Sequence, residues 1–116
     1  MNQTIFSLEK PYVQSYSDDS LIIDNREFYF PIILTTRKVI IDTLPRKIEE
    51  FYPNNISKLL EMNPELILIG TGKNHRIMDA HINQNDIGIE IMATGPACRI
   101  YNVMIEESRN VLAALY

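Results

Sequence analysis

The second half of the chain alternates between strand-like and helix-like hydrophobic patterns. Glu65 to Gly70 is a nearly continuous apolar run, which is typical of a strand buried on both faces. Two further strand patterns lie at Gly88 to Met92 and in the closing residues VLAALY. A helix is predicted before each of them, around Met78 to Gln84 and within TGPACRIYNVMIEESRN. The resulting β-α-β-α-β order predicts a three-layer α/β domain with a largely parallel sheet.

The first half is predicted to contain an arm and an N-terminal β-hairpin. Residues 1–19 are mixed in polarity and are expected to form an arm or one edge strand. Leu21 to Ile23 and Glu27 to Leu34 have strand patterns, and Asp24-Asn25 between them has the composition of a hairpin turn. Lys38 to Asp42 is another short strand candidate.

The return strand of the hairpin has a clear inward face. Phe28, Phe30, Ile32 and Leu34 recur at every second position, so they are expected to share one face of a sheet. Pro31 lies among them and has no N–H to donate. The strand is therefore expected to be an edge strand or to carry a bulge.

A short helix is expected to connect the two halves of one domain. Asn54 or Asn55 has the side chain to cap a helix over Ile56 to Met62, which Asn63-Pro64 would end. The length of 116 residues is that of one ordinary domain, and the chain contains no repeat or low-complexity tract. We therefore treat residues 1–116 as a single domain.

Composition and charge narrow the class of protein. The chain is 46% hydrophobic and 22% charged, as expected for a globular protein, and its net charge is −4. Nucleic-acid binding needs clustered Lys and Arg, which this chain lacks, so we expect no nucleic-acid partner. Its apolar stretches are far shorter than the roughly 20 residues that span a bilayer, so no integral membrane protein is expected. The start lacks the pattern of a secretory signal, and the lone Cys98 cannot form an intrachain disulfide; together they indicate a cytoplasmic location.

Two similar loops follow strands in the second half. IGTGKNH leaves the strand that ends at Gly70, and MATGPACR leaves the strand that ends at Met92. The first loop is not a P-loop, because Gly72-Lys73 is followed by Asn74 rather than Ser or Thr. It is not a dinucleotide fingerprint either, since His75 stands where a third glycine is needed. One interpretation is that its glycines only give the backbone freedom at a tight strand exit.

The alternative interpretation is a binding cleft formed by both loops. Parallel strands would bring the loops to the same edge of the sheet, where open α/β sheets bind ligands. The second loop opens a helix, with Thr94 or Gly95 at the N-cap, and helix N-termini bind anions. Lys73, Arg76 and Arg99 would supply positive charge. The candidate cleft consists of Gly70, Thr71, Gly72, Lys73, Arg76, Thr94, Gly95, Cys98 and Arg99.

Catalytic, metal and cofactor chemistry has little support in the sequence. Cys98 lies near the predicted helix start, where a thiol can become reactive, but no partner that would activate it is close in sequence. His75, His81 and Asp79 match no zinc-binding spacing. We therefore predict no catalytic residue, no metal ligand and no cofactor.

The two loops and their spacing resemble those of a known family. PELILIGTGKNHR, followed by GIEIMATGPACRIYNVMIEESRNVLAAL, is similar to the MTH-type family of unknown function, over about Leu21 to Leu115. That family includes mitochondrial complex I assembly factor three and an adipogenesis-associated domain protein. The resemblance implies a three-layer α/β fold with a central mixed sheet, and no established enzymatic activity or cofactor.

Two functional hypotheses follow. The first is a non-catalytic binding or assembly-factor-like module that acts on a protein partner, docked at the loop edge or at an apolar hairpin face containing Tyr29 and Ile33. The second is a small-molecule or anion-binding protein, or a weak enzyme, that uses the cleft between residues 70–76 and 94–99.

Overall fold

The fold is built around β9, the last strand of the chain. The computed structural model describes residues 4–51, 56–73 and 87–116. Its elements, in chain order, are β1 (Thr4–Ser7), β2 (Val13–Tyr16), β3 (Ser20–Ile23), β4 (Arg26–Tyr29), β5 (Ile32–Leu34), β6 (Lys38–Ile41), α1 (Ile48–Phe51), α2 (Ser57–Leu60), β7 (Leu66–Gly70), β8 (Gly88–Met92), α3 (Thr94–Glu106) and β9 (Val111–Leu115).

The main sheet is mixed and has the strand order β1-β6-β5-β9-β7-β8. β7 pairs in parallel with both β8 and β9, whereas β5 pairs antiparallel with β9, and β6 with β5 and β1. The predicted mixed α/β fold with a parallel core is therefore confirmed. The helix predicted around Met78 to Gln84 and the caps predicted at Asn54 or Asn55 lie outside the described residues.

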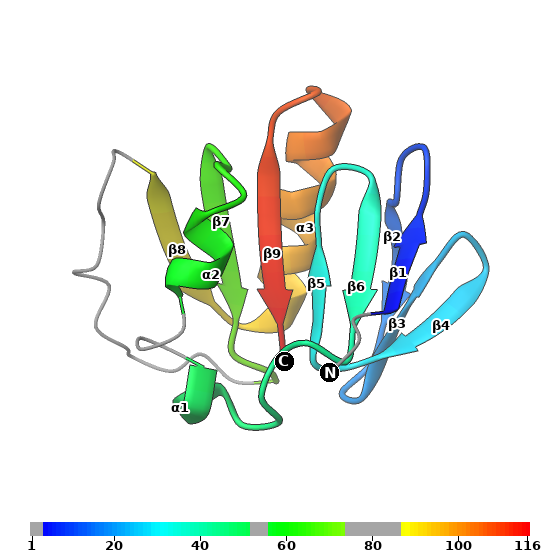
Figure 1. Cartoon of the computed structure of the whole chain (residues 1–116). Helices are drawn as coiled ribbons and strands as arrows, with labels where there is room; N and C mark the ends of the chain where they lie inside the picture. Colours follow the sequence, from blue (N-terminus) through cyan, green and yellow to red (C-terminus); the bar gives the residue numbers. More distant parts are fainter. Residues whose placement is uncertain (1–3, 52–55, 74–86) are drawn as a thin grey trace.

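Alternate residues of the central strands enter two separate cores. Leu68, Ala113 and Leu115 face the core that contains α3, whereas Ile69 and Ala114 face the core that contains α1 and α2. Figure 1 shows α3 behind the sheet and α2 in front of it. Every residue of β9 is buried, since both faces of this strand are covered.

A second, three-stranded sheet of order β2-β3-β4 shares the α3 side of the main sheet. β3 and β4 form the predicted hairpin, and Asp24 and Asn25 take the positive φ angles of 54° and 61° that its two-residue turn requires. The first 19 residues contain two strands, β1 and β2, each at the edge of a sheet. The arm or single edge strand expected there is therefore replaced by one edge strand in each sheet.

The predicted return strand is divided at Pro31. β4 ends at Tyr29 in the small sheet, and β5 begins at Ile32 in the main sheet, because Phe30-Pro31 carries the chain from one sheet to the other. The prediction of one continuous strand was wrong. The predicted inward face is nevertheless correct, since both strands direct it into the same core. The residues of that face that pack in this core are Phe28, Phe30, Ile32 and Leu34.

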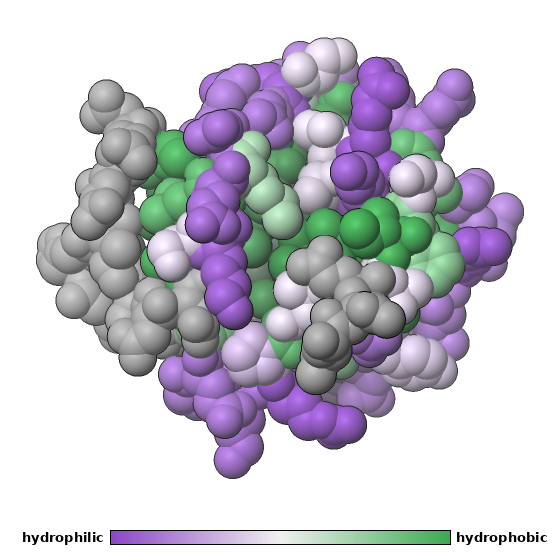
Figure 2. Space-filling view, viewed as in Figure 1, coloured by the Kyte–Doolittle hydropathy of each residue, from purple (hydrophilic) through white to green (hydrophobic). Residues whose placement is uncertain are grey.

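The hairpin face that was considered for partner docking is only partly exposed. Tyr29 is 65% exposed, but Ile33 is fully buried in the core beside α1 and α2, because β5 lies inside the main sheet. Figure 2 shows the face that carries α2, where apolar atoms gather over β9, β5 and β6 and hydrophilic ones surround them. A docking face that combines Tyr29 and Ile33 is therefore excluded.

Asn102 joins the final helix to the small sheet. Its Oδ1 accepts a hydrogen bond from Val13 N–H at 2.9 Å, and its Nδ2 donates to Val13 C=O at 3.0 Å. The side chain thus pairs with the β2 backbone as a neighbouring strand would. Asn102 lies among the apolar positions of this helix, and the two bonds satisfy its polar side chain.

Replacing Asn102 with alanine is expected to lower the free energy of unfolding by about 1–3 kcal/mol, because both polar groups of Val13 lose their partner. Urea denaturation followed by circular dichroism measures this change. Val103→Ala, at a side chain on the same helix that is 56% exposed, is the control and should change stability by less than about 0.5 kcal/mol. Equal stability of the two variants would contradict the proposed joint between α3 and β2.

Candidate functional site

The two glycine-containing loops meet at one edge of the main sheet. Thr94 Oγ1 accepts a hydrogen bond from Gly72 N–H at 2.9 Å, and Thr94 N–H donates to Gly72 C=O at 2.8 Å. Thr71 N–H also donates to Met92 C=O, at 2.8 Å. The predicted proximity of the loops, inferred from parallel strands, agrees with this geometry. We call this set of contacts the loop joint.

Gly70 makes the loop joint possible. A Cβ atom at this position would lie 2.8 Å from Thr94 Oγ1 and 2.9 Å from Leu115 Cδ2, closer than real Cβ atoms approach such neighbours. Thr71 and Thr94 are both buried. Gly72 has a φ angle of +96°, a conformation that residues with a side chain rarely adopt. These threonines and glycines therefore hold the two loops together, which favours the structural interpretation of the loop glycines.

The start of α3 offers few backbone groups to a ligand. The N-cap is Ala93, not Thr94 or Gly95 as expected, because the helical conformation already begins at Thr94. Thr94 N–H is bonded to Gly72, Pro96 has no N–H, and Ala97 N–H donates to Ala93 C=O. The ring of Tyr16 lies over Gly95 so closely that a Cβ there would be 2.5 Å from the Tyr16 hydroxyl oxygen.

The predicted cations near the joint have other contacts. Arg99 Nη1 donates to the Tyr16 hydroxyl at 3.0 Å, and Lys73 Nζ lies 3.8 Å from an Asp18 carboxylate oxygen in an exposed ion pair. Arg76 lies outside the described residues. A cavity of about 240 Å³ remains between the loops and β2, and its lining includes Lys73 and Gly95 but not Arg99. Four of the nine predicted cleft residues therefore line this cavity, and they are Gly72, Lys73, Thr94 and Gly95.

Cys98 faces the core beneath the joint and is 2% exposed. Burial raises the pKa of its thiol to about 11, and the nearby positive charge of Arg99 lowers the pKa only in part. The thiol is therefore protonated near neutral pH, whereas the nucleophilic form of cysteine is the thiolate. Tyr101 is fully buried beside it, and its hydroxyl donates to Thr35 C=O at 2.7 Å. Both side chains have the environment of structural core residues.

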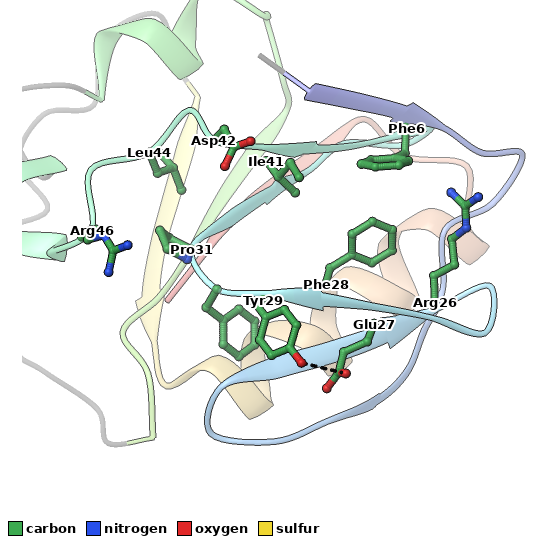
Figure 3. Close-up of a pocket in the computed structure, with 11 residues that line it drawn as sticks. Phe6, Arg26, Glu27, Phe28, Tyr29, Pro31, Ile41, Asp42, Leu44 and Arg46 are labelled. Atoms are coloured by element: carbon green, nitrogen blue, oxygen red, sulfur yellow. Dashed lines mark hydrogen bonds between the residues drawn. The ribbon is translucent and has the colours of Figure 1, made fainter. Parts of the chain in front are cut away.

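A larger hollow lies elsewhere, between the two sheets. Its volume is about 990 Å³. β4 with the following Phe30-Pro31 forms one wall, Phe6 closes one end, and the other wall consists of Ile41, Asp42, Leu44 and Arg46 (Figure 3). We call it the interlayer groove. It forms because neither α3 nor the main sheet fills the space beside β4.

The interlayer groove combines aromatic surface with charged ends. The rings of Phe6 and Phe28 meet edge to face with centroids 5.2 Å apart, and the Arg26 guanidinium lies 5.5 Å from the Phe6 centroid. Glu27 accepts hydrogen bonds from the hydroxyls of Ser20, at 2.6 Å, and Tyr29, at 3.1 Å. The bond to Glu27 raises the pKa of Tyr29. The groove was not predicted from the sequence, where the aromatic run REFYFP is the one local signal of it.

These features define a class of protein: a small α/β domain with a mixed sheet, a structural joint at its glycine loops and an open groove between its two sheets. The chain belongs to the family described as protein of unknown function (DUF498/DUF598), whose model matches residues 13–116. The resemblance to the MTH-type family is thereby confirmed. A solved Mth938-like domain from Bordetella pertussis has the same fold: the TM-score is 0.62 at 18% identity, over 90% of this chain and 84% of that one.

Two curated relatives are similar in sequence. The "13 kDa major membrane protein" of Francisella tularensis subsp. holarctica (strain LVS) is 30% identical over 110 residues, which are 86% of this chain and 85% of that protein. The bovine (Bos taurus) "NADH dehydrogenase (ubiquinone) 1 alpha subcomplex assembly factor 3" is 25% identical over 111 residues, which are 90% of this chain but only 59% of the bovine protein. No helix among the described residues is long and apolar enough to cross a bilayer. A cytoplasmic location stays a prediction.

Replacing Thr94 with valine tests the loop joint. Valine keeps the shape of threonine but cannot accept the Gly72 N–H, so the free energy of unfolding should fall by about 1–3 kcal/mol. Thr94→Ser keeps the hydroxyl and loses one methyl group, which should cost no more than about 1 kcal/mol. Both values come from urea denaturation. A valine variant at least as stable as the serine variant would show that the hydroxyl does not hold the joint.

Proposed function

We propose that this chain is a non-catalytic binding module, similar in role to an assembly factor, that acts through a protein partner docked in the interlayer groove. The observation that carries the proposal is the groove itself. Its volume of about 990 Å³ is at the upper end of the usual range for ligand sites, and it is open at the surface beside a tyrosine that is 65% exposed. Tyrosine is among the residues most enriched at protein interfaces, because its ring is apolar and its hydroxyl is polar.

The chemistry of the loop joint supports the same proposal. The polar groups that sequence patterns indicated as a cleft mostly bind each other, and the one thiol nearby is buried and protonated. The bovine relative is named as an assembly factor of an NADH dehydrogenase subcomplex, and an open groove provides a surface on which such a factor can hold a protein partner. This chain matches only part of that relative, so the comparison supports a protein-binding role and does not identify the partner.

Site-specific crosslinking in cells of the source organism tests this proposal. A photoreactive phenylalanine analogue placed at Tyr29 is expected to yield a discrete protein adduct, which mass spectrometry would identify, because Tyr29 lies at the groove. The matched control places the same group at Val103, which is also exposed but lies on α3. An adduct at position 29 and not at 103 is the expected result. No adduct at 29, or the same adducts at both positions, would refute docking at the groove.

A second candidate function is anion binding at the loop joint, and the cavity of about 240 Å³ beside Lys73 and Gly95 favours it. Inorganic phosphate is a suitable probe. At a phosphate concentration of 100 times the Kd, binding should add about 2.7 kcal/mol of apparent stability, seen as a rise in Tm. At constant ionic strength, Lys73→Gln is expected to remove this rise, whereas Lys58→Gln on α2 should keep it. Equal behaviour of the two variants would reject the site.

A further inference from the structure

β4 has a free edge whose backbone groups face the interlayer groove. Phe30 N–H donates to Asp19 C=O at 3.0 Å, and the β3–β4 register pairs Leu21 with Phe28. In an antiparallel pair, bonded and non-bonded positions alternate. The N–H and C=O groups of Glu27 and Tyr29 therefore point away from β3. No other strand of the described sheet lies on that side, since β4 is its last strand.

The interlayer groove follows this edge. Successive residues of a strand direct their side chains to opposite faces, so a hollow confined to one face contacts only every second residue. This groove contacts all four residues of β4. It therefore runs along the backbone edge, over a length of about 13 Å at about 3.3 Å per residue. In Figure 3 the lining residues are spread along β4, with Arg26 at one end and Arg46 beyond the other.

Arginines lie at both ends of the interlayer groove, and two carboxylates, Glu27 and Asp42, line it between them. Arg26 lies near one end, against the Phe6 ring, and Arg46 lies near the other (Figure 3). Neither arginine has a carboxylate partner within the part of the chain that the structure describes. The Glu27 carboxylate is already bound by two hydroxyl groups. Guanidinium groups bind carboxylates through paired N–H donors, so the groove has donors available at both ends.

We infer that the interlayer groove binds an extended peptide segment of a partner protein, which adds as a fourth strand to β4 and places acidic side chains on Arg26 and Arg46. Strand addition gives affinity through main-chain hydrogen bonds, and pockets for alternate side chains give specificity. The groups of Glu27 and Tyr29 supply the main-chain bonds, and Phe28, Phe30 and Leu44 supply the apolar surface. This inference rests on the proposed protein-binding function and specifies the chemistry of the partner.

A random dodecapeptide display library, selected against the full chain, tests this inference. The selected peptides are expected to share alternating apolar residues flanked by Asp or Glu. Synthetic copies should bind Arg26→Gln and Arg46→Gln about tenfold more weakly, as loss of one charge-assisted bond predicts. Arg37→Gln, an exposed arginine between β5 and β6, is the control and should bind them unchanged. Proline at inner peptide positions should reduce binding at least about tenfold, because it removes a backbone donor.

Several outcomes would overturn the inference. These are the absence of any enriched peptide family, selected peptides without acidic residues, and equal binding by the three arginine variants. If proline at the inner peptide positions left the affinity unchanged, strand addition would be excluded. A purified chain that is a stable dimer and binds no selected peptide would indicate a second copy in the groove. Crosslinking at position 29 distinguishes failure of the strand-addition inference from failure of the proposed protein-binding function. A partner that docks in the groove without adding a strand still gives an adduct at position 29.

Discussion

The reciprocal hydrogen bonds between Thr94 and Gly72 are the contact on which the rest of the architecture depends. β7 and β8 are parallel, so the loops that follow them leave the sheet at the same edge. The first backbone N–H and C=O groups of these loops need hydrogen-bond partners. The two loops provide these partners for each other, because Gly70 has no Cβ to keep Thr94 away. The joint sets where α3 begins, and α3 then places Asn102 against β2, which anchors the second sheet.

Because the loop joint occupies most polar groups of the two loops, few of them are available to bind a ligand. A pair of glycine loops at the carboxyl edge of parallel strands is the usual place for a ligand in an α/β protein. Here the polar groups of that edge are largely occupied by the joint, and Tyr16 covers Gly95 at the helix start. The small sheet and α3 divide one face of the main sheet between them, and the interlayer groove opens where the small sheet ends at β4. The hollow of about 990 Å³ therefore lies between the layers, whereas the cavity at the loop joint has a volume of only about 240 Å³.

The sequence predicted the central elements because their patterns are local. Leu66–Gly70, Gly88–Met92 and α3 each had a distinct hydrophobic pattern, and the parallel-strand rule correctly brought the loops together. The break at Pro31 was not predictable in this way, because Phe28 to Leu34 keep one inward face while the strand changes its sheet. The groove was missed for a related reason: its walls come from β4 and from Ile41 to Arg46, and only the stacking of two sheets brings these segments together. Lys73 and Arg99 stay predicted binding residues, and their contacts with Asp18 and Tyr16 depend on β2 and the turn after it, which no motif in the loops specifies.

Native-state hydrogen exchange measured by NMR on the free chain tests the central claim most directly, because it compares the joint with the β4 edge in one experiment. The account predicts that the amides of Gly72 and Thr94 exchange only with a free energy close to that of global unfolding. It predicts that the amides of Glu27 and Tyr29, which face the open groove, exchange with little protection. Slow exchange at Glu27 and Tyr29 together with fast exchange at Gly72 and Thr94 would contradict both the structural joint and the free edge.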